Sequence, residues 1–114
     1  MKDYKFEIEV DGVKHNLVFN LNVMEEIQQE YGTIQKWGEL TDGKGGEVDI
    51  KALKFGLTSM LNEAIDIENE TAEAKKEFFT TKQVGRLVTK LGVEEATKQL
   101  NKAVIESSKN DEKN

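Results

Sequence analysis

The chain contains few residues that could carry out chemistry together. It has one histidine, His15, and no cysteine, so the sequence offers no thiol nucleophile, no disulfide and no zinc–thiolate site. His15 lies in a stretch of alternating apolar residues, where a structural imidazole is expected rather than a general base. No local pattern places a serine or threonine beside it as a nucleophile. We therefore predict that the protein is not an enzyme and uses no cofactor.

Residues 41–47 combine glycines with acidic side chains, a composition that also occurs in metal and phosphate sites. An EF-hand needs oxygen ligands at loop positions one, three and five, whereas a loop that starts at Asp42 puts Lys44 at the third position and Gly46 at the fifth. The Gly-Lys-Gly triplet at 43–45 lacks both the upstream glycine and the hydroxyl residue of a phosphate loop. The sequence therefore predicts a flexible surface loop here, with neither a metal nor a nucleotide.

Charge limits the partners that the protein can have. The 114 residues include 22 Asp and Glu against 16 Lys and Arg, a net charge of −6. An acidic chain without clustered cations is poorly suited to bind nucleic acid. No apolar run is long enough for a signal peptide or a membrane span, so we predict a soluble, cytoplasmic protein. Residues 78–114 carry an excess of Lys and Arg, which leaves head-to-tail self-association open beside the simpler interpretation of solvated helix faces.

Length and pattern predict one α+β domain. A chain of this size can bury about two-thirds of its unfolded surface in a single core. We expect residues 1–106 to form this domain, with an N-terminal antiparallel β-hairpin followed by a bundle of four to five helices. The polar residues 107–114 are expected to form a flexible tail.

The first nineteen residues contain the signature of a hairpin. Apolar and charged residues alternate over 4–10, and Asp11 with Gly12 is a favoured pair for a type I′ turn. The resulting register pairs Tyr4 with Phe19, Phe6 with Leu17, Ile8 with His15 and Val10 with Val13. A lone hairpin is marginally stable in water, so a helix or another chain's strand must cover its apolar face.

Helix signals follow the hairpin. Asn22 with Glu25 is a capping-box variant that predicts a helix ending at Gly32. Further helices are predicted at 33–40, at about 50–68 with Asp49 as the cap, from Thr80 with Gln83 to Gly92, and at about 93–106.

Four large aromatic side chains exceed what a small core needs. Phe55 lies nearly opposite the apolar arc of helix 50–68, Trp37 lies on a short helix, and Phe78 and Phe79 precede a helix start. The hairpin or the final helices could instead cover each of them. Because an exposed group of two or three would make a protein-binding patch, we predict Phe55, Trp37, Phe78 and Phe79 as partner-binding residues.

The order of these elements resembles a known family. Residues 21–37, the glycine-rich break, helix 49–57, the segment 79–92 and a last helix containing 100–105 together resemble the tail assembly chaperones of long-tailed bacteriophages and of prophages of Gram-positive bacteria. The resemblance covers about residues 4–106. It consists of helix starts, apolar spacing and a Tyr-Gly stop, with no catalytic signature.

The resemblance implies a non-enzymatic function in virion assembly. Such proteins bind the long tape measure protein, keep it soluble and help to recruit tail tube subunits, and they are absent from the finished tail. Many also exist in a longer form made by ribosomal frameshifting, and the polar segment 107–114 is where such an extension would begin here. Helix-in-groove binding is the mode we expect.

A structural protein of the virion is the alternative. In a small tail completion or head-tail joining protein, the hairpin would pair edge to edge with other copies in a ring. The presence of this chain in purified tails would favour that alternative, and its absence would favour the chaperone.

Overall fold

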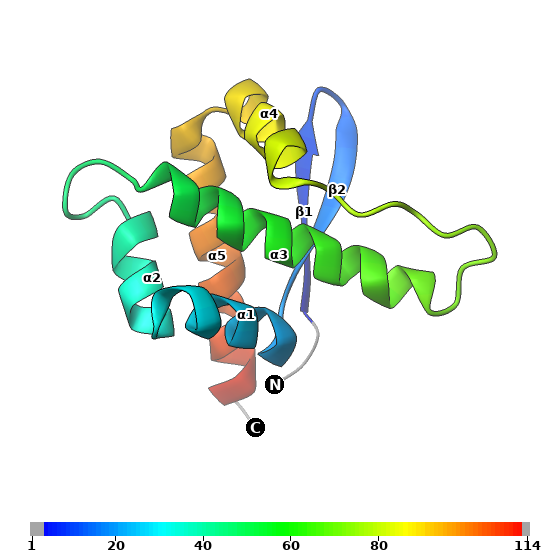
Figure 1. Cartoon of the computed structure of the whole chain (residues 1–114), viewed down its shortest axis with the longest axis horizontal. Coiled ribbons are helices and arrows are strands. Elements are labelled where there is room, and N and C mark those ends of the chain that lie inside the picture. Colours follow the sequence, from blue (N-terminus) through cyan, green and yellow to red (C-terminus); the bar gives the residue numbers. More distant parts are fainter. Residues whose placement is uncertain (1–3, 113–114) are drawn as a thin grey trace.

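A two-stranded antiparallel sheet and five helices make up the computed structural model, which describes residues 4–112 (Figure 1). The elements are, in chain order, β1 (Tyr4–Val10), β2 (Val13–Phe19), α1 (Leu21–Tyr31), α2 (Ile34–Thr41), α3 (Ile50–Asn69), α4 (Thr81–Leu91) and α5 (Val93–Glu112). This arrangement confirms the predicted α+β class. No helix of the described part is long and apolar enough to cross a membrane.

The hairpin has the predicted register. Val10 pairs with Val13 and Ile8 with His15, and the pairing continues to the far end of both strands. Asp11 and Gly12 both have positive φ angles, 52° and 79°, as a type I′ turn requires. Leu17 and Phe19 are buried in the core, and β2 packs mainly against α3. A helix of the same chain therefore covers the apolar face.

The start of α1 corrects the predicted cap. Asn20, and not Asn22, is the N-cap, and its side-chain oxygen accepts a hydrogen bond from the Val23 N–H at 3.2 Å. Since β2 ends at Phe19, Asn20 is the first residue after the strand that can cap a helix, so α1 begins two residues earlier than predicted. Asn22 instead donates a hydrogen bond to Glu63 on α3.

The starts of α2, α3 and α4 lie within one residue of the predicted ones, although Thr33, predicted as the first residue of its helix, is the cap. Thr33 and Asp49 cap α2 and α3 through their side chains. Thr80 and Gln83 form the complete capping box of α4. Gly32 and Gly92 end α1 and α4 with positive φ, a conformation that glycine adopts without steric cost.

The last helix is longer than the sequence predicted. α5 continues to Glu112, six residues beyond the expected end at 106, and Ser107 is buried. The described part of the polar segment 107–114 is therefore helical, while its flexibility stays a prediction. Residues 113 and 114 lie outside the described part.

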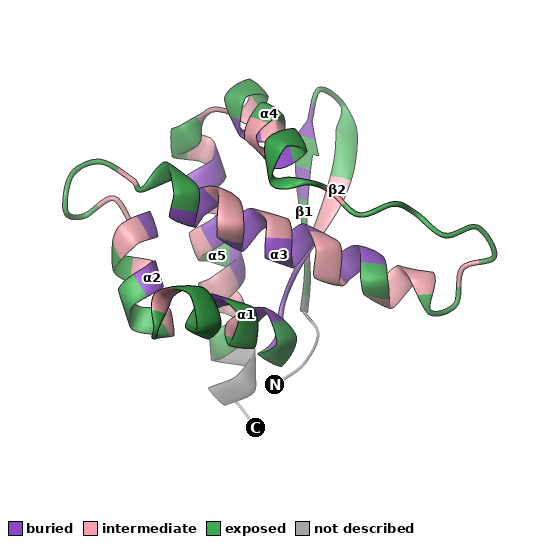
Figure 2. Cartoon of the chain, viewed as in Figure 1, coloured by how far each residue is buried: buried purple, intermediate pink, exposed green. Residues whose placement is uncertain are grey.

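α3 is the central element, and its inner face forms much of the core (Figure 2). The hairpin and α5 lie behind it in Figure 1, with α1 and α4 on either side. Gly56 allows the closest approach, because a Cβ atom at this position would lie 2.4 Å from a ring carbon of Trp37. The Trp37 indole N–H donates a hydrogen bond to the Ala52 carbonyl at 3.0 Å, which fixes α2 against α3.

Candidate functional site

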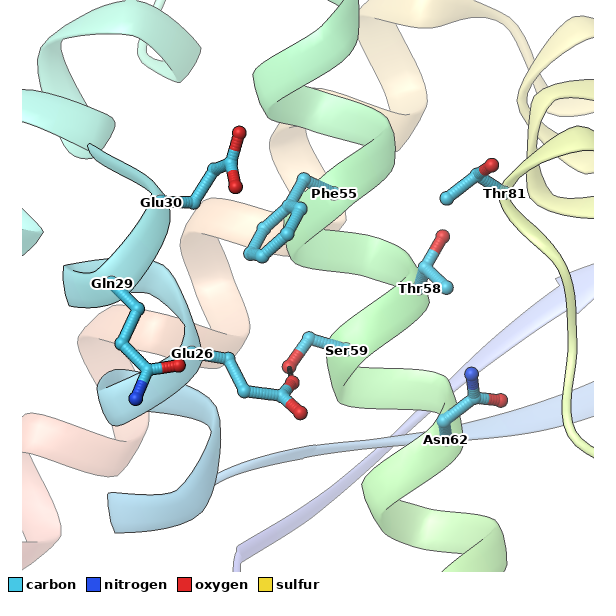
Figure 3. Close-up of a pocket in the computed structure, with 8 residues that line it drawn as sticks. All are labelled: Glu26, Gln29, Glu30, Phe55, Thr58, Ser59, Asn62 and Thr81. Carbon is cyan, nitrogen blue, oxygen red and sulfur yellow. Dashed lines mark hydrogen bonds between the residues drawn. The ribbon is translucent and has the colours of Figure 1, made fainter.

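The outer face of α3 is open. A hollow of about 430 Å³ lies there between α1, α3 and the start of α4 (Figure 3). Toward Ile50 it continues into a hollow of about 380 Å³, with which it shares Phe55 and Thr81. Toward Asp66 it continues into a third hollow, of about 250 Å³. We call these connected hollows the α3 groove.

The α3 groove is long enough for a peptide of several helical turns. At 1.5 Å per residue, the stretch of α3 from Ile50 to Asp66 is about 24 Å long. Its two sides come from different parts of the sequence, with α1 on one side and the segment around Phe78 and Thr81 on the other. A segment that binds there would contact three elements at once.

One side of α3 supplies the floor of the groove. Phe55, Ser59 and Asn62 recur at helical spacing and therefore face the same way. The Phe55 ring is half-buried and makes an edge-to-face contact with Tyr31, at 5.7 Å between ring centroids. The Ser59 hydroxyl donates a hydrogen bond to the Glu26 carboxylate, which joins α1 to α3. The floor thus combines one aromatic surface with polar groups that already have partners.

Acidic side chains predominate around the groove. Four carboxylates line it, against two ammonium groups: Glu26, Glu30, Glu63 and Asp66, and Lys51 and Lys54. Lys51 lies 3.5 Å from Glu30, in an exposed ion pair. The remaining charge of the lining is therefore negative, and most of it lies toward the Asp66 end.

Two of the four predicted partner-binding residues lie in the groove. Phe55 forms part of the floor, and Phe78 lines the hollow at the Asp66 end with 53% of its surface exposed. The structure therefore brings together one residue from the back of the long helix and one from the segment before α4. Whether they bind a partner stays a prediction.

Trp37 and Phe79 do not line the groove. Trp37 is only 1% exposed, because its ring fills the space above Gly56 in the core, so this residue is corrected to a core residue. Phe79 is half-buried, and its ring packs edge to face against His15 at 5.6 Å. Asn62 holds the backbone of Phe79 through two hydrogen bonds, of 3.0 and 2.8 Å. Phe79 is thus turned toward the hairpin.

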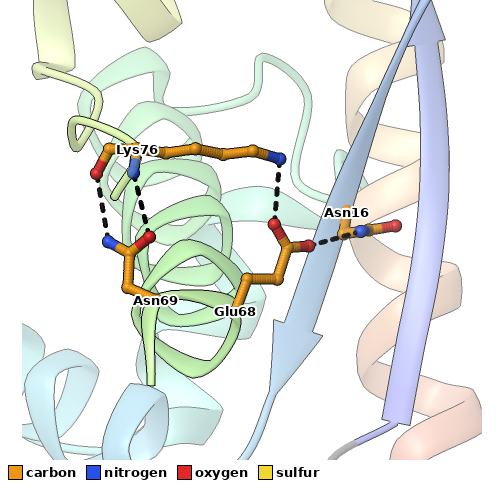
Figure 4. Close-up of polar contacts among 4 residues, drawn as sticks. All are labelled: Asn16, Glu68, Asn69 and Lys76. Carbon is orange, nitrogen blue, oxygen red and sulfur yellow. Dashed lines mark hydrogen bonds and ion pairs between the residues drawn. The ribbon is translucent and has the colours of Figure 1, made fainter. Parts of the chain in front are cut away.

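A separate hollow of about 290 Å³, outside the α3 groove, lies between β2, the end of α3 and the segment before α4. Glu68 accepts hydrogen bonds from Asn16 at 2.9 Å and from Lys76 at 3.0 Å (Figure 4). Asn69 holds the backbone of Lys76 through two hydrogen bonds, of 3.0 and 2.9 Å. These contacts fasten residues 70–80 to the rest of the molecule.

Two titratable groups that line this separate hollow have shifted pKa values. Burial, together with the positive charge of Lys76, lowers the pKa of His15 below its ordinary value of 6.5. Hydrogen bonds from Lys76 and Asn16 lower the pKa of Glu68. At neutral pH His15 is therefore uncharged and Glu68 is ionised. Among the described side chains, no group of three His, Asp or Glu residues is placed to hold a metal ion.

The sequence reasoning missed the polar residues of the groove. Glu26, Thr58, Ser59 and Asn62 line it beside Phe55. The signal was present for three of them, since Thr58, Ser59 and Asn62 follow Phe55 at three-, four- and seven-residue spacing and so share its face of the helix. Glu26 had no such signal, because its place depends on how α1 packs on α3.

Comparisons with protein-family models, with curated proteins and with solved structures found no match for this chain.

Proposed function

We propose that this protein is a non-enzymatic tail assembly chaperone of a long-tailed phage or prophage. In this function it binds the tape measure protein in the host cytoplasm, keeps it soluble, helps to recruit tail tube subunits, and is left out of the finished virion. The resemblance of residues 4–106 to that family supports the proposal. The α3 groove supplies the surface on which such a client would bind.

The observation that carries the proposal is an open groove with an exposed aromatic side chain in an acidic protein. Phe78 is half exposed in a hollow next to Asp66, and Phe55 lies in the adjoining hollow. A tape measure protein is expected to be a long helical chain whose apolar stripes are exposed until the tube encloses them. A groove that covers such a stripe, on a carrier of net charge −6, would oppose aggregation of the client.

Co-expression with the tape measure protein encoded in the same genome tests the proposal. We expect a larger soluble fraction of the client and its co-purification with this chain. The matched variants Phe78→Ser and Ile105→Ser compare two side chains that are each 53% exposed, one in the groove and one on α5. Only Phe78→Ser is expected to lower client solubility. Unchanged client solubility with the native chain, together with no co-purification, would refute the proposal.

The alternative, a structural protein of the virion, is supported by the small sheet. Within residues 4–112, β1 and β2 pair only with each other, so each strand has one edge without a strand neighbour. Such an edge can pair with a strand of another copy. Stoichiometric amounts of this chain in purified tails would favour this function over that of a chaperone.

A further inference from the structure

We infer that the α3 groove binds one basic amphipathic helix of the client. The identity of the client rests on the proposed function, whereas the chemistry of the bound segment follows from the groove itself. Three properties of the groove carry the inference: the kind of wall, the placement of the aromatic side chains, and the charge around them.

The walls favour a helix over an extended peptide. α1, α3 and the start of α4 line the central hollow, and backbone groups within helices bond to one another. An extended peptide needs backbone partners from an open strand edge, which these walls do not offer. A helix satisfies its own backbone and presents only side chains, so it can fill the groove without leaving unpaired polar groups.

The aromatic side chains define what the helix must present. Phe55 belongs to the hollows at the Ile50 end and the centre, and Phe78 to the hollow at the Asp66 end. Phe78 shares its hollow with the α3 residues from Ser59 to Asp66, which follow Phe55 by four to eleven positions, so the two aromatic side chains lie about one to three turns apart along α3. A partner helix with apolar residues about seven positions apart on one face would contact both.

Charge complementarity specifies the flanks of the helix. Once Lys51 is paired with Glu30, the lining keeps three carboxylates, Glu26, Glu63 and Asp66, against Lys54. Two of these carboxylates also accept hydrogen bonds, from Ser59 and from two asparagines, which hold them in place without neutralising their charge. Lysine or arginine beside the apolar stripe would therefore be attracted, and glutamate or aspartate would be repelled.

Two designed peptides test the inference on the full chain. Both are fluorescein-labelled 18-residue helices with the same apolar stripe, and the flanking positions are lysine in one and glutamate in the other. By fluorescence anisotropy at low salt we expect the lysine peptide to bind at least about tenfold more tightly. The difference between the two affinities should decrease as sodium chloride is added, because Glu26 and Asp66 are exposed to solvent.

Matched variants locate the binding. Asp66→Lys should weaken the binding of the lysine peptide severalfold. Glu7→Lys, on the exposed side of β1, makes the same change in net charge and should have little effect on that binding. Phe78→Ser should weaken the binding of both peptides by about tenfold. Ile105→Ser, which removes an equally exposed side chain on α5, should leave the binding of both peptides unchanged. Thermal unfolding of each variant verifies that it is folded.

Several results would overturn the inference. Equal binding of the two peptides, no binding of either, or equal effects of Asp66→Lys and Glu7→Lys would each exclude a charge-selective groove. A dimer in sedimentation that Phe78→Ser abolishes would assign the groove to a second copy of the chain. If the native chain still keeps the tape measure protein soluble in any of these cases, the proposed function stands and only the groove inference fails.

Discussion

The two faces of α3 differ in how they are held. On the inner face, Gly56, Leu57 and Met60 are buried, and Trp37 packs directly on Gly56. On the outer face, Phe55, Thr58 and Asn62 are half-buried and contact their neighbours mainly through polar groups and ring edges. One helix thus carries a close-packed face that fixes the fold and an open face that lines the α3 groove. Substitutions on the two faces should therefore have effects of different kinds.

The largest effect is expected for Gly56→Ala on the inner face. The new methyl group would lie 2.4 Å from Trp37 and 3.2 Å from Leu100, so the ring must move or the helices must separate. We expect the free energy of unfolding to fall by about 3 kcal/mol, measured by urea denaturation. Gly38→Ala is the matched control, because its methyl group meets no atom within 4 Å and should stabilise α2 by about 0.5–1 kcal/mol. Equal values for the two variants would contradict the close packing at Gly56.

Asn62→Ala, on the outer face, should have the next largest effect. The substitution removes both hydrogen bonds to the Phe79 backbone, at a partly buried position. We expect a loss of about 2 kcal/mol in chemical denaturation. Asn69→Ala removes the same pair of bonds to Lys76 at an exposed position, where water replaces them, so about 1 kcal/mol or less is expected. A larger loss at Asn69 would reverse this order.

A smaller effect, of opposite sign, is expected for Tyr31→Phe beside the groove. The Tyr31 hydroxyl is buried and has no hydrogen-bond partner among the described residues, while the ring contacts Phe55. Removal of this hydroxyl should leave the free energy of unfolding unchanged or raise it by up to about 1 kcal/mol, because the buried oxygen loses its water on folding without gaining a bond. Thermal denaturation measures the change, and a clear loss of stability would indicate that the hydroxyl has a partner.

The smallest effect concerns pH, at the far end of α3. Burial lowers the pKa of His15 in the folded protein, so between that pKa and 6.5 the unfolded chain binds more protons and stability rises with pH. The carboxyl of Glu68 also has a lowered pKa, and its contribution is lost at more acidic pH, from about 4.5 downward. Chemical denaturation at several pH values between 5 and 7 should therefore show a shallow rise in the free energy of unfolding with pH, and His15→Gln should remove this rise. Persistence of the increase in this variant would assign it to another group.

Much of the fold could be predicted because local signals agreed with one another. The turn at Asp11 and Gly12 determines which residues pair in the hairpin, and the caps at Asp49 and Thr80 mark where helices begin. The start of α1 was predicted wrongly because Asn22 with Glu25 matched a capping pattern, whereas Asn20 caps the helix as the first residue after β2. The predicted register already ended the strand at Phe19, so the error came from preferring the capping-box match at Asn22 to the first polar residue after the strand.

The groove was predicted only in part, because its walls are distant in the sequence. Phe55 and Phe78 were selected as exposed aromatic residues, and both line it. Trp37 was selected on the same ground, as a large aromatic side chain, but its ring is buried against Gly56 on another helix, where the missing side chain leaves space for it. The place of Glu26 and Glu30 in its lining depends on the packing of α1 against α3, which no spacing within either segment specifies.

The burial of Trp37 provides an optical reporter. It is the only tryptophan of the chain, its ring is shielded from water, and its N–H is bonded to the Ala52 carbonyl. Its emission should therefore lie at short wavelength in the native protein and move to longer wavelength on unfolding. Because Trp37 lines none of the hollows of the α3 groove, a bound peptide should leave that emission unchanged, and a red shift would mean that α2 has separated from α3.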